Sequence, residues 1–415
     1  MAPPTVTLEH LAAHVTAGWP SPRVVVPGNF ATPWAVVDAL DAALERWTLH
    51  LLNPQPGVPV REGVTIETCF VGPGARKAPT LSYVPSRLSM VPLLLRRHLV
   101  PDVVVLHTTP PRDGVVSLGI EVNIMPGAIE AVRAAGGLVV AAVNPRMPFT
   151  YGDAVVPLDD VDMLVEIEQP LQSPPHLEPD EASKEIGARV AARVPDGATL
   201  QAGIGAIPDA AIGGLLDRRD LKVWSEMISD GVLALEREGA LDPHTAVRSS
   251  FLFGSPELYD WVDCNERIRM VRTEKANDPG RIASQPAMVS INSALQVDLF
   301  DQANASRVGK QIYSGFGGQS DFVVGALHSP GGQAIIALRS WHPKADRSTI
   351  VPMLDEPVTS FMHSAVVTEH GTAEIVGADQ STIARRLIDE AADPRARDEL
   401  REAGAELGLI GAWTS

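Results

Sequence analysis

Short apolar runs recur along the first half of the chain, and the stretches between them have helical periodicity. The runs show little alternation of polar and apolar positions; they are residues 23–26, 103–106, 137–143 and 163–167. The stretches with helical periodicity include residues 34–40 and 128–135. Unalternated strands separated by helices are typical of a parallel sheet that is covered on both faces. The first half is therefore predicted to be an α/β domain.

The same alternation begins again after a segment that is rich in proline and polar residues. This segment covers residues 168–180 and predicts a linker, and residues 181–194 after it predict a helix. The second half then offers further strand candidates: residues 198–201, 221–224, 268–271, 287–291, 334–337 and 365–367. A charged amphipathic helix is expected over residues 394–407. We therefore predict two α/β domains, covering residues 1–180 and 181–415.

Charge and cysteine content narrow the function classes. The 415 residues carry a net charge of −17, whereas a nucleic-acid-binding protein needs a basic surface, so no nucleic acid partner is expected. An anionic small molecule stays compatible with this charge, because a few backbone amides can hold a phosphate on an acidic protein. Cys69 and Cys264 are too few for a disulfide framework and are expected to be reduced thiols.

The sequence also predicts where the protein resides. The N-terminus has no basic segment followed by an apolar run, and no apolar stretch approaches the roughly 20 residues of a membrane span. No histidines and cysteines have metal-ligand spacing. We therefore expect a cytoplasmic protein without a membrane partner or a bound metal.

Two glycine-rich segments lie between a predicted strand and a helix. The first, Gly203-Ile204-Gly205-Ala206-Ile207-Pro208, follows a strand that ends at Gln201. Glycine lets a ligand approach the backbone, and a helix N-terminus favours an anion, although such turns are often only tight connections. The second, Gly315-Phe316-Gly317-Gly318, either presents backbone N–H groups to a developing oxyanion or forms a surface turn.

Two further segments place polar side chains after predicted strands. Glu226 follows the strand 221–224, and ligands of open parallel sheets bind at the carboxyl ends of strands. A carboxylate can be a covalent nucleophile, but by pattern alone a Glu here is more often a solvated residue or a helix cap. Residues 144–153 follow the strand 137–143 and either line a pocket or only connect two elements.

Three common site types lack support. The chain has no Gly-x-Ser-x-Gly elbow of the serine hydrolases and no Walker A motif. A dinucleotide-binding fingerprint would need a third glycine after Gly203-Ile204-Gly205, where the chain has Pro208. This difference counts against a dinucleotide-binding oxidoreductase.

Taken together, the segments resemble the acetyl-CoA hydrolase/transferase family and, within the class I CoA-transferases, the 4-hydroxybutyrate CoA-transferase group. The resemblance extends over nearly the whole chain. The matching stretches are residues 144–148, 203–210, 225–231, 277–279, 288–298 and 313–322. Several matches in the same order are far more specific than one glycine-rich turn. The resemblance implies two similar open α/β/α domains of the CoA-transferase type with mostly parallel sheets.

The resemblance also implies an activity. A CoA-transferase moves coenzyme A between an acyl-CoA and a short-chain carboxylate, here of acetate, butyrate or 4-hydroxybutyrate type. The implied nucleophile is Glu226, which passes through a mixed anhydride to a glutamyl-CoA thioester and gives ping-pong kinetics. The implied contacts with CoA are Gly203, Ile204, Gly205, Ala206, Ile207, Gly317 and Gly318. Gln201 is expected at the acyl site, and the N–H of Gly317 or Gly318 is the candidate oxyanion donor. CoA is a substrate, no tightly bound cofactor is expected, and a homodimer is implied.

The chain departs from the family pattern at three positions. Residues 367–371 are similar to a further family segment, with His370 where Tyr is usual. Asn29 stands where the family has a His near the acyl pocket, and Trp224 stands where a His is common before the Ser-Glu-Met segment. Asparagine forms hydrogen bonds but does not carry a proton as histidine does. The changes at Asn29 and Trp224 leave the identity of the acyl group open, and they do not affect the nucleophile. Two alternatives to transfer remain: hydrolysis of an acyl-CoA by the same glutamate, and CoA binding without catalysis, which the presence of Glu226 disfavours.

Overall fold

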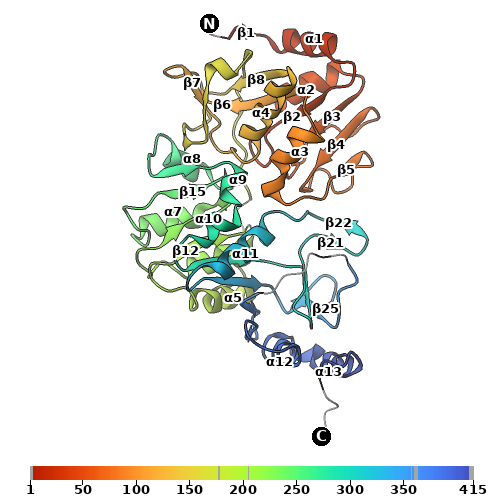
Figure 1. The fold of residues 1–415 in the computed structure, drawn as a ribbon, viewed down its shortest axis with the longest axis vertical. Helices are drawn as coiled ribbons and strands as arrows, with labels where there is room; N and C mark the ends of the chain where they lie inside the picture. Colours follow the sequence, from red (N-terminus) through yellow and green to blue (C-terminus); the bar gives the residue numbers. More distant parts are fainter. Residues whose placement is uncertain (1–2, 176–177, 204, 357, 359–362, 411–415) are drawn as a thin grey trace. The chain divides into compact units, whose positions relative to one another are not determined.

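The structure is a computed structural model, and it describes residues 3–175, 178–203, 205–356, 358 and 363–410. Contacts within the chain divide it into two compact units, whose elements carry the labels of Figure 1. Unit 1 comprises Met1–Pro174, Ala246–Asn277 and Tyr313–Gly318, and unit 2 comprises Pro175–Thr245, Asp278–Ile312 and Gln319–Ser415. Two segments of the predicted second domain therefore pack with unit 1.

An eight-stranded sheet forms the core of unit 1, and every neighbouring pair of its strands is parallel. Across the sheet the order is β1 (Thr5–Val6), β11 (Met163–Glu166), β8 (Leu138–Val143), β6 (Val103–Thr108), β2 (Arg23–Val25), β3 (Trp47–His50), β4 (Val64–Thr68) and β5 (Leu81–Tyr83). All residues of β6 and β8 are buried. Burial on both faces explains their unalternated sequences and confirms the predicted parallel sheet.

Unit 1 also contains six α-helices among its described residues, of which the first four connect strands of this sheet. They are α1 (Leu8–Gly18), α2 (Trp34–Ala43), α3 (Val91–Arg97), α4 (Met125–Ala135), α8 (Pro256–Val262) and α9 (Thr273–Ala276), with 3-10 turns at Leu88–Met90 and Leu158–Asp160. Thr7 caps α1 by accepting a hydrogen bond from the His10 N–H, and Gly136 ends α4 in the left-handed conformation. From β2 the chain proceeds through β3, β4 and β5 on one side and then returns to β6 on the other. The topological switch point of this sheet therefore lies between β2 and β6.

Unit 1 also contains short strands outside the main sheet. β7 (Val115–Ser117) pairs with β10 (Val155–Pro157), and β17 (Ile268–Met270) pairs with β15 (Val247–Ser249) and β9 (Tyr151–Gly152). A further strand is β16 (Phe251–Leu252). The strand predicted at residues 268–271 is thus present, but its placement in the sheet of the second half is wrong. A short apolar run indicates a strand without indicating its partner.

A six-stranded sheet forms the core of unit 2. Its order is β13 (Lys222–Val223), β12 (Thr199–Ala202), β18 (Met288–Asn292), β23 (Gln333–Ala337), β27 (Ala365–Val367) and β28 (Thr372–Glu374). The first five strands are parallel, and β28 is antiparallel to β27. The chain passes from β12 to β13 on one side and later to β18 on the other. The switch point of this sheet therefore lies between β12 and β18.

The other elements of unit 2 are helices, turns and short strands outside the six-stranded sheet (Figure 1). The helices are α5 (Glu181–Ala191), α6 (Ala206–Gly213), α7 (Asp230–Arg237), α10 (Pro279–Ala283), α11 (Gln319–His328), α12 (Gln380–Arg386) and α13 (Arg397–Glu406), with a π-helical turn at Leu387–Ala391 and a 3-10 turn at Pro394–Ala396. The short strands are β14 (Met227–Ile228), β19 (Gln296–Asp298), β20 (Ala303–Asn304), β21 (Arg307–Val308), β22 (Gln311–Ile312), β24 (Trp341–His342), β25 (Arg347–Ser348) and β26 (Ile350–Val351). Among the described residues of the chain, no helix has the length and apolar character needed to cross a membrane.

Candidate active site

The switch point of the unit 2 sheet carries a buried cluster of polar side chains. Gln201 on β12 lies beside Ser290 on β18, since the two residues are partners in the parallel register. The Ser290 hydroxyl donates to Gln201 Oε1 over 2.6 Å, and the Asn292 amide donates to the same oxygen over 3.1 Å. Gln201 Nε2 in turn donates to Asn292 Oδ1 over 3.2 Å. The cluster fixes the orientation of the Gln201 amide where open α/β sheets bind their ligands.

The predicted glycine turn follows directly after this cluster. The Gly203 N–H donates to the Ile291 carbonyl over 3.0 Å, and a Cβ on Gly203 would lie 3.6 Å from Asn292 Oδ1. Gly205 precedes α6 with φ 130°, a conformation that residues with a side chain rarely adopt. Ala206 and Ile207 form the first turn of α6, where unpaired backbone N–H groups and the helix dipole favour an anion. Ile204, another predicted CoA contact, lies outside the described residues.

Glu226 lies at the same edge of the unit 2 sheet. Val223 is the register partner of Leu200, and the Trp224 N–H donates to the Leu200 carbonyl over 3.1 Å. Glu226 therefore follows the carboxyl end of the strand next to the one that leads into the glycine turn, and it is partly buried between two buried neighbours. After it, the Ser229 hydroxyl donates to Asp209 Oδ1 on α6 over 3.2 Å. The structure thus brings Glu226, Gln201 and the turn to one edge of one sheet.

A cavity of about 360 Å³ opens beside this turn at the carboxyl ends of β18 and β23. Its lining comprises Ile207, Ser293, Ala294, Leu295, Leu338, Arg339, Trp341, His342, Pro343, Lys344 and Thr349. Three of these side chains carry or can carry positive charge, which makes the cavity suitable for an anion. Sequence reasoning identified Ile207 but missed Arg339, His342 and Lys344. Their position just after the predicted strand 334–337 was the available signal.

Asn29 lies at the switch point of the other sheet, in unit 1. Its Nδ2 donates to Glu121 Oε2 over 2.9 Å, and its Oδ1 accepts from Asn53 Nδ2 over 2.8 Å. Asn29 and Glu121 are both buried. Asn29 and Asn53 each have φ 47°, the left-handed conformation that asparagine tolerates better than most residues. Sequence reasoning found Asn29 but not Asn53 or Glu121, which are far from it in sequence.

A buried histidine holds the loop that carries Asn29. His107 Nδ1 donates to the Ala31 carbonyl over 2.8 Å, and its Nε2 accepts from Asn144 Nδ2 over 3.0 Å. This arrangement requires a neutral ring, and burial lowers the pKa of His107 to about 4. Asn144 also donates to the Gln169 carbonyl over 2.8 Å. Asn144 therefore joins two connections of unit 1, one of which contains Gln169.

The second glycine segment belongs to unit 1. Gly317 has φ 59°, forms a parallel bridge with Arg87, and its carbonyl accepts from the Leu88 N–H over 3.1 Å. A Cβ on Gly317 would lie 3.1 Å from the Phe70 ring, and one on Gly315 would lie 2.6 Å from the Cys69 carbonyl. Both positions thus need glycine for close packing, and Gly317 also needs it for its conformation. Gly318 follows as a buried turn residue before α11.

Comparison with known proteins gives the chain its family. The model of the acetyl-CoA hydrolase/transferase N-terminal domain matches residues 63–171, and that of the acetyl-CoA hydrolase/transferase C-terminal domain matches residues 254–404. The 4-hydroxybutyrate coenzyme A transferase of Clostridium kluyveri is 36% identical over 403 residues, which cover 91% of this chain and 92% of that protein. The chain belongs to the acetyl-CoA hydrolase/transferase family. It is an enzyme of the CoA-transferase type, as the resemblance implies.

Solved structures of related proteins have the same fold. The crystal structure of RipA from Yersinia pestis superposes with a TM-score of 0.89 at 29% identity, covering 96% of this chain and 97% of that chain. The 4-hydroxybutyrate CoA-transferase from Porphyromonas gingivalis gives a TM-score of 0.82 at 30% identity, covering 97% of this chain and 98% of that chain. The predicted CoA-transferase fold is thereby confirmed. An acetyl-CoA hydrolase of Candida albicans is 28% identical over 313 residues, which cover 68% of this chain and 58% of that protein.

Proposed function

We propose that the enzyme transfers coenzyme A between an acyl-CoA and a short-chain carboxylate through a thioester on Glu226. The observation that carries the proposal is the position of Glu226 at the sheet edge that also holds Gln201 and the turn beginning at Gly203. The relative in Clostridium kluyveri is a 4-hydroxybutyrate coenzyme A transferase, which supports the same reaction class. Acetate, butyrate and 4-hydroxybutyrate are the candidate carboxylates.

The first half of the reaction loads CoA onto the enzyme. A carboxylate oxygen of Glu226 attacks the thioester carbonyl carbon, the carbon–sulfur bond breaks, and CoA leaves as a thiolate from a mixed anhydride. The thiolate then attacks the glutamyl carbonyl carbon and expels the acyl group as a free carboxylate. A glutamyl-CoA thioester remains. Each step exchanges one activated acyl bond for another, so the sequence requires no ATP.

The second half reverses these steps with a different acid. The acceptor carboxylate attacks the glutamyl carbonyl carbon and releases the thiolate, which then attacks the acceptor's carbonyl carbon in the new anhydride. This attack regenerates the Glu226 carboxylate and yields the new acyl-CoA. Negative charge develops on the carbonyl oxygen in every step, and backbone N–H groups aimed at that oxygen stabilise such charge. Because the first product leaves before the acceptor enters, we expect ping-pong kinetics.

The cavity lined by Ile207 is the proposed site for the phosphate-bearing part of CoA. Lys344 and His342 of its lining are exposed, and Arg339 is partly buried and pairs with Asp180. An acidic protein needs such local positive charge to bind an anion like CoA. Gln201, at the same sheet edge as Glu226, is the proposed polar contact of the acyl group.

Chemical trapping tests the nucleophile. We expect borohydride or hydroxylamine, added after an acyl-CoA, to modify the protein at Glu226 as detected by peptide mass spectrometry. Glu226→Gln keeps the side-chain size and is expected to lose the modification and at least about 10³-fold in kcat, since removal of a covalent nucleophile abolishes the normal route. Glu238→Gln, at an exposed glutamate after α7, is the matched control and should behave like the unmodified enzyme. Normal activity of Glu226→Gln would refute the mechanism.

Hydrolysis is the second candidate, because a relative that covers two thirds of the chain is an acetyl-CoA hydrolase. The same glutamyl-CoA thioester would then be cleaved by water. Release of CoA thiol is compared with formation of a new acyl-CoA in the presence of acetate, propionate, butyrate, 4-hydroxybutyrate or succinate. Transfer predicts that thiol release is slow and that one acid accelerates turnover strongly. Thiol release that is equally fast without any acid would favour the hydrolase.

A further inference from the structure

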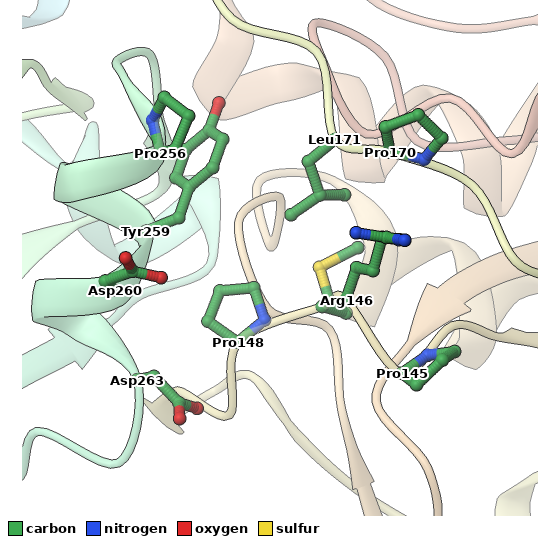
Figure 2. A pocket seen from close by; sticks show the side chains of 10 residues that line it. Pro145, Arg146, Pro148, Pro170, Leu171, Pro256, Tyr259, Asp260 and Asp263 are labelled. Atoms are coloured by element: carbon green, nitrogen blue, oxygen red, sulfur yellow. The ribbon is translucent and has the colours of Figure 1, made fainter.

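A second cavity, of about 450 Å³, lies at the carboxyl ends of β8 and β11 in unit 1. It is lined by Pro145, Arg146, Met147, Pro148, Pro170, Leu171, Pro256, Tyr259, Asp260 and Asp263. Figure 2 shows residues of α8 and the following Asp263 on one side, and the loop after β8 with Pro170 and Leu171 on the other. Its volume is in the range of small-molecule sites. Its lining includes residues 145–148 of the Asn144-Pro-Arg-Met-Pro stretch, for which the transfer reaction gives no role.

The wall of this cavity is rich in groups that accept hydrogen bonds and poor in groups that donate them. Four of its ten lining residues are prolines, which have no backbone N–H. The hydroxyl of Tyr259 donates to the Gln172 carbonyl over 2.9 Å. Arg146, the cation of the lining, pairs with Glu168 over 3.2 Å. The donors that an anionic ligand would need are thus few or already engaged.

The carboxylates of Asp260 and Asp263 are on the side of the cavity opposite Arg146 (Figure 2). Asp260 is exposed and makes no side-chain hydrogen bond or ion pair within the described part of the chain. Asp263 accepts the Phe149 N–H over 2.7 Å at Oδ1, which holds its carboxylate at the rim. Arg112 approaches the adjacent Cys264 sulfur at 3.7 Å and also pairs with Asp113 at 3.7 Å, so it offsets Asp263 only in part. Both aspartates lie at the C-terminal end of α8, where the helix dipole adds negative potential.

We propose that this cavity binds a small organic cation with an apolar body, such as a primary alkylamine in its ammonium form. The ammonium group would donate to Asp260 and Asp263. The alkyl chain would lie against Met147, Leu171 and the proline rings, which provide apolar contact without competing donors. The inference does not depend on the proposed transfer reaction.

The side chain of Met147 provides a probe inside the cavity. The enzyme is labelled with ¹³C at its methionine methyl groups, of which the chain has ten, and the Met147 signal is assigned with Met147→Leu. The full chain is titrated with n-pentylammonium, with pentan-1-ol as the neutral isostere and with pentanoate as the anion. We expect a saturable shift of the Met147 signal with the ammonium ion alone, and weaker binding at higher salt.

Charge removal completes the test. Asp260→Asn is expected to weaken pentylammonium binding at least ten-fold, while Asp159→Asn, at an exposed aspartate elsewhere in unit 1, leaves it unchanged. Unchanged signals of the other methionines show that the variants are folded. The proposal is overturned if pentanol or pentanoate shifts the Met147 signal as strongly, if Asp260→Asn binds normally, or if pentylammonium produces no shift. Trapping at Glu226 is unaffected by any of these results, so the two proposals fail independently.

Discussion

At the scale of single residues, long-range partners decide what a predicted side chain can do. Gln201 was predicted at the site because it precedes the first glycines, but its hydrogen bonds to Ser290 and Asn292 arise from the pairing of β12 with β18. Likewise, Asn29 was predicted, whereas Glu121 and Asn53 reach it across 92 and 24 positions of sequence. Sequence patterns identify such residues when they lie near a motif. They do not identify partners that only the fold brings close.

His107 leads to a prediction about pH. Its pKa of about 4 in the folded protein is below the roughly 6.5 of an unfolded chain, so between these values only the unfolded state binds the proton. Stability should therefore fall by about 3 kcal/mol as the pH decreases through this window. His107→Gln is expected to be less stable at neutral pH but to lose less stability on acidification. Urea unfolding from about pH 7 to 4.5 measures both slopes, as the linkage relation requires. His10→Gln, at an exposed histidine, is the control, and equal slopes for enzyme and His107→Gln would contradict the assignment.

At the scale of elements, the sequence predicts strands and turns well and their neighbours poorly. The order strand, Gly-x-Gly turn and helix was predicted from residues 198–210 and is present as β12, the turn and α6. The same rules found the strand at 268–271 but assigned it to the wrong sheet. Propensity and periodicity act within a few residues, whereas sheet membership depends on contacts between distant segments.

The turn before α6 gives the second prediction. Gly205 has φ 130°, and a Cβ there would meet nothing within 4 Å, so Gly205→Ala is strained by its conformation alone. We expect it to raise the KM for acyl-CoA several-fold and to cost about 1–3 kcal/mol of stability. Gly213→Ala, in the same helix, has equal space without a positive φ and should be neutral or stabilise by up to about 1 kcal/mol. Thermal unfolding and steady-state kinetics of both variants are compared. Equal behaviour would show that the conformation of Gly205 is unimportant.

At the scale of the whole molecule, alternation of strands and helices predicted two α/β halves, and both sheets are largely parallel. The sequence did not predict which segments of the chain belong to which compact unit. Residues 246–277 and 313–318 pack with unit 1, because β17 pairs with β9 and the loop at Gly317 bridges Arg87. The amino-acid composition does not change at the ends of these two segments in a way that would indicate their assignment to unit 1. The rule that ligands bind at the carboxyl ends of parallel strands was applied to Glu226, which does follow the carboxyl end of β13.

Net charge gives the last prediction, because a protein of charge −17 is expected to repel the anionic CoA unless local cations compensate. Lys344 is an exposed cation in the lining of the unit 2 cavity, so removing its charge tests this requirement. Lys344→Gln is expected to raise the KM for acyl-CoA about ten-fold with little change in kcat, since one charge-assisted contact contributes roughly that factor. The difference should shrink as salt rises, because exposed charges are screened. Lys184→Gln, at an exposed lysine of α5 outside the cavity lining, is the control. If both variants keep the original KM at low and high salt, the phosphate-bearing part of CoA binds elsewhere on the enzyme.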